Sequence, residues 1–133
     1  MTVSLSVVHV FVDDPEAALA FYRDALGLEV VNDVANGDFR WITVASPDQP
    51  GVGIVLSQPQ AGRSAEDGEA LAALLAKGEL RPMHLSSDDL AGTFERIAKV
   101  PGAEILQEPA DQPWGPRDCA FRDPSGNMVR ISA

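Results

Sequence analysis

The sequence predicts an α+β fold made of two tandem βαβββ modules that form an open, cleft-bearing sheet. Two observations carry this prediction. The second half of the chain repeats features of the first, and each half holds one amphipathic helical segment among four short β-rich segments. The 133 residues also have the length of one domain. We therefore expect a single domain over 1–133, with module one at 1–57, a linker at 58–80 and module two at 81–133.

The repeat has a constant offset of 75 residues, which joins His9 to His84. The same offset continues through helix caps and turns to the end of the chain, pairing Asp13-Asp14 with Asp88-Asp89, Gly27 with Gly102, Asp48 with Asp123 and Gly51 with Gly126. Caps and turns restrict the choice of residue through their backbone geometry. The matched positions therefore indicate the same chain path in both halves.

Module one begins with a strand over residues 4–12, where β-branched and apolar residues recur with period two. A helix follows, because Asp14 suits the N-cap, Pro15 the first helical position and Gly27 the C-terminal cap. Three further strands are expected at 28–33, 39–46 and 53–57.

Module two follows the same order after the linker. The sequence predicts a strand over 82–87, a helix that begins at Asp89 and stops at Pro101-Gly102, and strands over 104–108, 117–122 and 128–132. Within the linker, the alanine- and leucine-rich stretch 69–77 predicts a short helix ending at Gly78.

The charge balance narrows the classes of partner. The chain has 20 acidic and 10 basic residues and a net charge of −10, which disfavours nucleic acid and anionic membrane surfaces. A solvated acidic surface is the simple interpretation, and an acidic cleft for a cationic ligand is the alternative.

No apolar run reaches the length of a membrane span, and residues 1–12 lack the features of a secretory signal, so we expect a cytoplasmic protein. The single cysteine, Cys119, excludes an internal disulfide framework and is expected to be a small buried residue rather than a nucleophile.

The two histidines, His9 and His84, occupy matching strand positions and are the first candidate ligand-binding residues. One sheet face in each module is covered by its helix, and the two uncovered faces could surround a shared cleft toward which both imidazoles point. Neutral imidazoles there could act as general acid or base, or bond to a ligand. They could instead be structural strand residues, or form a displaced two-histidine metal site.

Arg130, Trp41 and Trp114 complete the candidate ligand-binding set. On a cleft-facing strand position, the guanidinium of Arg130 suits a carboxylate or phosphate, although a structural ion pair is an equal alternative. Trp41 lies in a predicted strand and Trp114 in the loop before one. Each ring could cover a flat ligand or serve as an apolar plug on the sheet.

Two stretches carry a family resemblance. Residues 10–27 contain Asp13-Asp14, Ala20-Phe21-Tyr22 and Leu26-Gly27, and residues 121–127 read FRDPSGN before the last strand. With the repeat, they make the whole chain resemble the vicinal-oxygen-chelate superfamily, which includes glyoxalase I, bleomycin-resistance proteins, fosfomycin-resistance transferases and extradiol dioxygenases. The resemblance implies the fold named above and commonly a homodimer whose chains cover each other's sheets.

The resemblance also maps the metal-ligand positions of the metal-dependent members onto the first and last strands of each module. These positions fall on Val7, Val55, Pro82 and Arg130. None of the four side chains suits a divalent metal. We therefore expect no metal and no cofactor.

Three functions remain open at this point. The first is a bleomycin-resistance-like protein that binds a small organic molecule between its modules. The second is a glyoxalase-like metal-dependent lyase, isomerase or dioxygenase. The third is a metal-free enzyme that uses His9 or His84 as acid–base group, with Arg130 stabilising an oxyanion. The sequence does not decide whether the protein is an enzyme.

Overall fold

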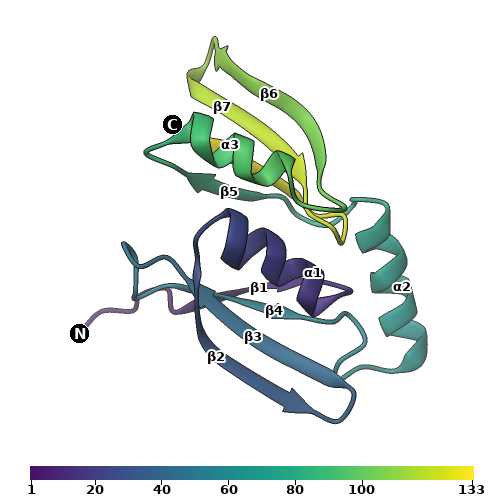
Figure 1. The fold of residues 1–133 in the computed structure, drawn as a ribbon. Coiled ribbons are helices and arrows are strands. Elements are labelled where there is room, and N and C mark those ends of the chain that lie inside the picture. Colours follow the sequence, from purple (N-terminus) through teal and green to yellow (C-terminus); the bar gives the residue numbers. More distant parts are fainter.

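Two four-stranded mixed sheets form the framework of the computed structural model, which describes residues 1–133 (Figure 1). The first sheet has the order β1-β4-β3-β2 and the second the order β5-β8-β7-β6. Their strands are β1 (Val7–Phe11), β2 (Glu29–Asn36), β3 (Phe39–Ala45), β4 (Gly53–Ser57), β5 (Met83–Ser86), β6 (Glu104–Gln112), β7 (Gly115–Arg122) and β8 (Met128–Ser132). In both sheets the first and last strands of the module pair in parallel and the other pairs are antiparallel. The predicted pair of βαβββ modules is confirmed.

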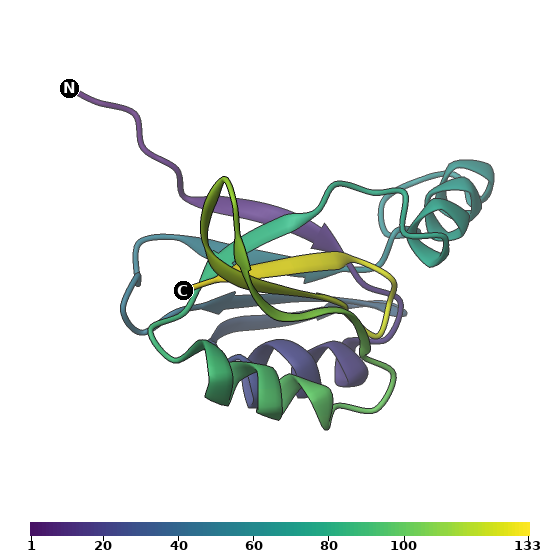
Figure 2. The same ribbon diagram turned by 90° about the horizontal axis from the view of Figure 1, so that it is seen from above.

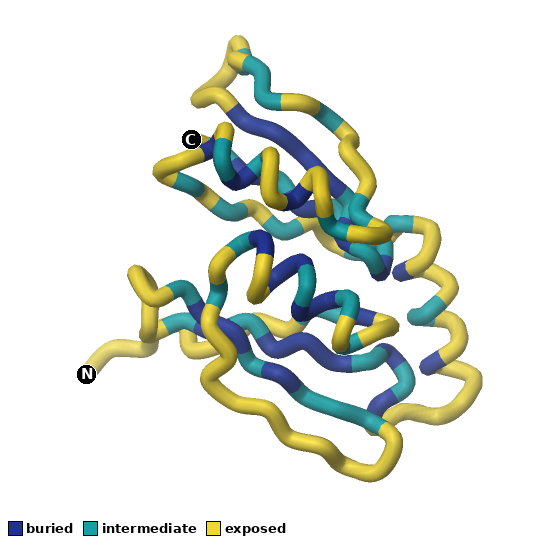
Figure 3. The backbone as a smooth tube through the Cα atoms, viewed as in Figure 1, coloured by how far each residue is buried: buried dark blue, intermediate teal, exposed yellow.

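The helices of the two modules lie on the same side of the sheets (Figure 2). In the first module, α1 (Pro15–Leu19) continues as the π-helical segment η1 (Ala20–Ala25), and the second module contributes α3 (Leu90–Ala98). One apolar core fills the space between helices and sheets and includes residues of both modules (Figure 3). No helix covers the opposite side of either sheet (Figure 2). We call these two helix-free sides the open faces.

The helix ends follow the predicted caps. The Asp14 carboxylate accepts the N–H groups of Glu16 and Ala17 at the start of α1, and Asp89 accepts the N–H of Gly92 in α3. Gly27 has a φ of 76°, the left-handed conformation expected of a glycine after a helix end.

Several strand ends differ from the prediction. β1 begins at Val7 rather than at residue 4, because β4, its only partner in the sheet, begins at Gly53 opposite Val7. β2 and β6 extend to Asn36 and Gln112, beyond the predicted ends at 33 and 108. Each is held by the antiparallel ladder of a hairpin, with register shifts in β6 on either side of its Pro109.

The linker helix α2 (Ala65–Ala76) begins four residues earlier than predicted. The Ser64 hydroxyl caps it by accepting the N–H of Asp67 at 3.2 Å, which lets the helix include Gly68. Leu75 of α2 is 1% exposed, and its backbone carbonyl lies against Gly126 of the second module. A side chain at Gly126 would collide with the Leu75 carbonyl, so a glycine is needed at this contact. None of the helices has the length and hydropathy that crossing a membrane requires.

The first helix is not the regular amphipathic helix that its spacing predicts, because it ends in the π-helical segment η1. There the N–H of Leu26 donates to the carbonyl of Phe21, five residues earlier, at 3.0 Å. Phe21 and Tyr22 are both fully buried, with their rings edge to face at a centroid distance of 4.9 Å. The Tyr22 hydroxyl thereby reaches the second module.

A buried turn of the second module receives that hydroxyl. Asp123 is 2% exposed, and its Oδ1 accepts the N–H groups of Ser125, Gly126 and Asn127 at 2.8–3.0 Å. Its Oδ2 accepts the Tyr22 hydroxyl at 2.7 Å and the Asn127 side-chain amide at 2.8 Å. The FRDPSGN stretch is therefore a turn organised around one carboxylate.

Two further contacts tie this turn to the first module. The Ser125 hydroxyl donates to the Asp13 carboxylate at 2.9 Å, and the Asn127 side chain donates to the Phe11 carbonyl at 2.8 Å. We call the group of Asp13, Tyr22, Asp123, Ser125 and Asn127 the Asp123 latch. It joins the modules along one side of their interface.

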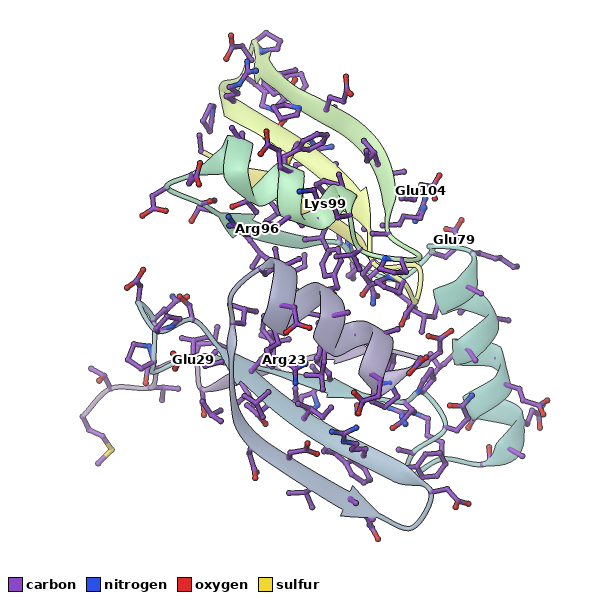
Figure 4. All side chains as sticks on the ribbon, in the orientation of Figure 1. Arg23, Glu29, Glu79, Arg96, Lys99 and Glu104 are labelled. Carbon is purple, nitrogen blue, oxygen red and sulfur yellow. The ribbon has the colours of Figure 1, made fainter.

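The opposite side of the interface lacks such a latch. At the 75-residue offset, Tyr22, Ser125 and Asn127 correspond to Ile97, Pro50 and Val52, whose side chains cannot form the same hydrogen bonds. A groove of about 930 Å³ lies there, between the loop before β4 and the start of α3. Arg96 borders it and points from α3 toward η1, where its Nε donates to the Ala25 carbonyl at 3.0 Å (Figure 4). The modules are thus joined by several hydrogen bonds on the side of the latch and by fewer on the side of the groove.

Candidate ligand site on the open sheet faces

The open face of the first sheet is mainly apolar. Strand register places His9 beside Val55 and Val55 beside Thr43, and it pairs Trp41 with Val34 on the edge strand. His9 is exposed, and Trp41 is partly buried. This face therefore offers an aromatic ring, aliphatic side chains and one imidazole.

The linker covers one end of the same face. The guanidinium carbon of Arg63 lies 4.9 Å from the centroid of the Phe11 ring, within the range of a cation–π contact. The guanidinium also donates to the carbonyls of Pro59 and Ala61. Phe11 is therefore already covered within the chain, whereas Trp41 lies further along the sheet, on β3.

The open face of the second sheet carries a charged network instead. Register places His84 on β5 beside Arg130 on β8, and Arg130 beside Ala120 on β7. Arg130 Nη1 donates to Asp118 Oδ2 at 3.0 Å and to Gln107 Oε1 at 3.1 Å. The amides of Gln107 and Gln112 donate to Asp118 Oδ1 at 2.9 and 2.8 Å. We call these four residues the Arg130 network.

Within this network, Asp118 is the buried member, at 4% exposure. Burial alone would raise the pKa of its carboxyl, but the hydrogen bonds from Gln112, Gln107 and Arg130 and the Arg130 charge outweigh burial and lower that pKa. Asp118 is therefore ionised at neutral pH. Arg130 lies in a structural ion pair, the alternative that the sequence left open.

The Arg130 network still has unused donors. Both hydrogen bonds of Arg130 use Nη1, so its Nε and Nη2 bond to no group of the chain. No buried side-chain nitrogen or oxygen in the structure lacks a partner, so these two nitrogens are accessible to solvent. The Arg130 side chain, 26% exposed, can therefore donate to a ligand on the open face.

The structure brings together only part of the predicted site. His84 and Arg130 are neighbours, and His9 and Trp41 lie on the other sheet. Trp114 lies in the turn between β6 and β7 and is 78% exposed. The groove between the modules is lined by His84 but by none of the other four residues. The chain alone therefore does not enclose the five side chains in that groove.

Sequence reasoning missed Asp118, Gln107 and Gln112. A signal for Asp118 was present, because the FRDPSGN turn sets the register of the hairpin around it. That register puts Ala120 opposite Arg130 and Asp118 one step further along the same face. The two glutamines were not predictable, because β6 pairs with β7 through shifted register.

The positions that carry metal ligands in metal-dependent members do not fit a metal here. Val7 and Val55 lie on β1 and β4, Pro82 precedes β5, and Arg130 is held by Asp118. Three of these side chains have no donor atom, and the fourth is a cation. Nowhere in the chain do three His, Cys, Asp or Glu side chains gather in a group that could hold a metal ion.

Cys119 lies on the core side of β7, at 0% exposure. Burial, followed by the Asp118 charge, raises the pKa of the thiol to about 11. A thiol that is buried and protonated at neutral pH is a poor nucleophile. The prediction that Cys119 is a small buried residue is confirmed.

The family follows from a match that spans nearly the whole chain. The model of the Glyoxalase/Bleomycin resistance protein/Dioxygenase superfamily matches residues 4–131. The chain belongs to this superfamily. The resemblance seen in the two sequence stretches and the repeat is therefore confirmed.

Two solved structures and one further relative show how similar the chain is to known proteins. The crystal structure of UcmS2 shares 34% identity with a TM-score of 0.84, covering 99% of this chain and 98% of that one. TnmS3, described as an antibiotic binding protein from Streptomyces sp. CB03234, shares 26% identity with a TM-score of 0.71, covering 99% and 97%. "Uncharacterized protein YurT" of Bacillus subtilis (strain 168) is 31% identical, with 94% of each chain covered.

Proposed function

We propose that this protein binds a small organic molecule on its open faces and releases it chemically unchanged, without a metal. One observation carries the proposal: the Arg130 network holds oriented donors on a sheet face where no group of metal ligands exists. Directed polar groups beside an apolar surface are typical of small-molecule sites. The description of TnmS3 as an antibiotic binding protein supports the same class of function.

In this proposal the two open faces contribute different interactions. Trp41, with His9 on the same face, supplies an aromatic and apolar surface, which favours a flat ring system. His84 and Arg130 supply hydrogen bonds that orient the ligand. Trp114 is proposed to close over the ligand from the β6–β7 turn.

We propose further that the protein works as a homodimer whose second copy covers the open faces. Large apolar side chains are exposed along β1, β2 and β6, among them Val7, Val31, Val34, Ile105 and Leu106. Exposed apolar groups on sheet strands favour burial against another surface. Light scattering coupled to size exclusion should give twice the monomer mass of 14.1 kDa, and a monomer at micromolar concentration would contradict the proposal.

Calorimetric titration with a panel of antibiotics, followed by mass analysis of the recovered ligand, tests binding. We expect a ligand that binds and returns unchanged. His84→Ala and Arg130→Ala should each weaken it about tenfold or more, as expected for loss of a hydrogen bond from the site. Asp24→Asn, which changes a side chain on η1 away from the open faces, is the control. If both site variants bind like the parent, the assignment to the open face is wrong.

A metal-free enzyme remains the second candidate, because His84 lies beside Arg130 on neighbouring strands. An imidazole next to a cationic donor could move a proton at a carbonyl compound. Recovery of a changed ligand, with loss of turnover in His84→Ala, would favour this candidate over binding. Stoichiometric metal in protein purified without added metal would contradict both.

A further inference from the structure

We propose that the Arg130 network selects ligands with an uncharged acceptor, such as a carbonyl or amide oxygen, over carboxylates and phosphates. This inference rests on the proposed function and gives the class of ligand for the same site. It reverses the sequence-based expectation that Arg130 suits an anion.

The charge of Arg130 is balanced within the chain. Its Nη1 lies 3.0 Å from Asp118 Oδ2, and Gln107 bridges the two groups by accepting from Arg130 and donating to Asp118. Asp118 has donors on both oxygens, from Gln107 and Gln112 on Oδ1 and from Arg130 on Oδ2. The network is thus complete without a ligand anion and has no net charge.

The free groups of the network are donors. Nε and Nη2 of Arg130 have no partner in the chain and are accessible, while both oxygens of Asp118 are already bonded. An acceptor on the ligand can therefore bond to Arg130. If that acceptor were an anion, it would also lie close to the Asp118 charge, and the repulsion would offset the attraction of Arg130. A neutral oxygen accepts the same hydrogen bonds without this repulsion.

The first module shows that the charge pair is specific to one half of the site. At the 75-residue offset, Arg130, Asp118 and Gln107 correspond to Val55, Thr43 and Asn32. The first open face therefore has no counterpart of the charge pair. The net charge of −10 over the whole chain adds to the barrier against anions.

A series of three proteins with different charge in the network tests the inference. Gln107→Glu adds a negative charge, the parent is neutral, and Asp118→Asn leaves Arg130 unbalanced. The probes are naphthalene-2-carboxamide and naphthalene-2-carboxylate, which share one ring system and differ in the charge of the acceptor. Their dissociation constants are measured by NMR titration, with the Arg130 Nε–H signal reporting contact at the site.

We expect the parent to prefer the carboxamide. Asp118→Asn should shift the ratio of affinities toward the carboxylate by about tenfold, the effect of one charge-assisted hydrogen bond, and Gln107→Glu should shift it the other way. Asp24→Asn is the matched control. It removes the same charge from the Asp24–Arg23 pair on η1, away from the open faces, and should leave the ratio unchanged.

Three results would overturn the inference: a parent that prefers the carboxylate, a ratio that stays constant across the series, or an Arg130 Nε–H signal that neither probe moves. If Asp118→Asn does not fold, the comparison of Gln107→Glu with the parent decides alone. The antibiotic titration keeps the two proposals separate. A panel antibiotic that moves the Arg130 Nε–H signal and is weakened by Arg130→Ala, in a parent that prefers the carboxylate probe, would retain the proposed function and reject this inference.

Discussion

At the scale of single residues, Tyr22 shows how one buried hydroxyl connects the modules. Its oxygen lies 2.7 Å from Asp123 Oδ2, and the residue is fully buried. Burial is the largest cause that raises the pKa of Tyr22, and the charge of Asp123 and the hydrogen bond to it act in the same direction. The hydroxyl is thus held protonated in the folded protein.

Tyr22→Phe should lower the free energy of unfolding by about 1–3 kcal/mol, because Asp123 would lose one of its donors in a buried place. Urea denaturation measures the change. Ser132→Ala, which removes a hydroxyl with no side-chain bond, should change stability by less than about 0.5 kcal/mol. Equal stability of Tyr22→Phe and the parent would show that the hydrogen bond adds nothing to the interface.

The raised pKa of Tyr22 also predicts a loss of stability in alkali. A raised pKa in the folded state stabilises the protein fully below the unfolded value, which is about 10 for tyrosine, and the contribution is lost as pH rises above it. Tyr22 is the only tyrosine, so the rise in absorbance at 295 nm that accompanies tyrosine ionisation comes from it. We expect ionisation only together with unfolding. A titration near pH 10 in a protein that stays folded would contradict the structure.

At the scale of elements, local signals and tertiary pairing decide different parts of the fold. The helix starts at Asp14 and Asp89 and the stop at Gly27 were predictable, because caps act within a few residues. The ends of β2 and β6 were not, because each depends on the register of its partner strand. The FRDPSGN turn sets the register of β7 and β8, so the position of Asp118 near Arg130 was predictable but was missed.

Helix α2 provides a test of one missed cap. Ser64→Ala should lower the free energy of unfolding by about 1 kcal/mol, because the N–H of Asp67 loses its acceptor. Ser64→Gly should lower the free energy of unfolding by only about a few tenths of a kcal/mol, since glycine is tolerated at this position. Urea denaturation of both variants checks the order. If alanine and glycine cost the same, the cap does not set the start of α2.

At the scale of the whole molecule, the Asp123 latch makes the interface between the modules asymmetric. The N–H of Gly126 bonds within the latch to the Asp123 carboxylate at 2.9 Å. At the 75-residue offset, Gly51 lies in the loop before β4, and its N–H has no such carboxylate partner. The two modules share a fold, but only the turn that contains Gly126 has this hydrogen bond to a carboxylate.

This asymmetry predicts different hydrogen exchange at the two matched glycines. The amide of Gly126 should exchange more slowly than that of Gly51 by about tenfold or more, because it must break its bond to Asp123 before it exchanges. Exchange followed by NMR measures both in one sample. Tyr22→Phe should speed exchange at Gly126 and leave Gly51 unchanged. Equal exchange rates in the parent would show that the side of the interface with the Asp123 latch opens as readily as the side with the groove.

The one-sided latch has a consequence for recombining the halves of this gene product. Tyr22 and Asp13 come from the first half, and the turn that receives them comes from the second. A chain assembled from two first halves would have the tyrosine without its receiving turn, and one assembled from two second halves would have the turn without the tyrosine. The two halves are therefore complementary, and neither half can replace the other in forming the hydrogen bonds of the latch.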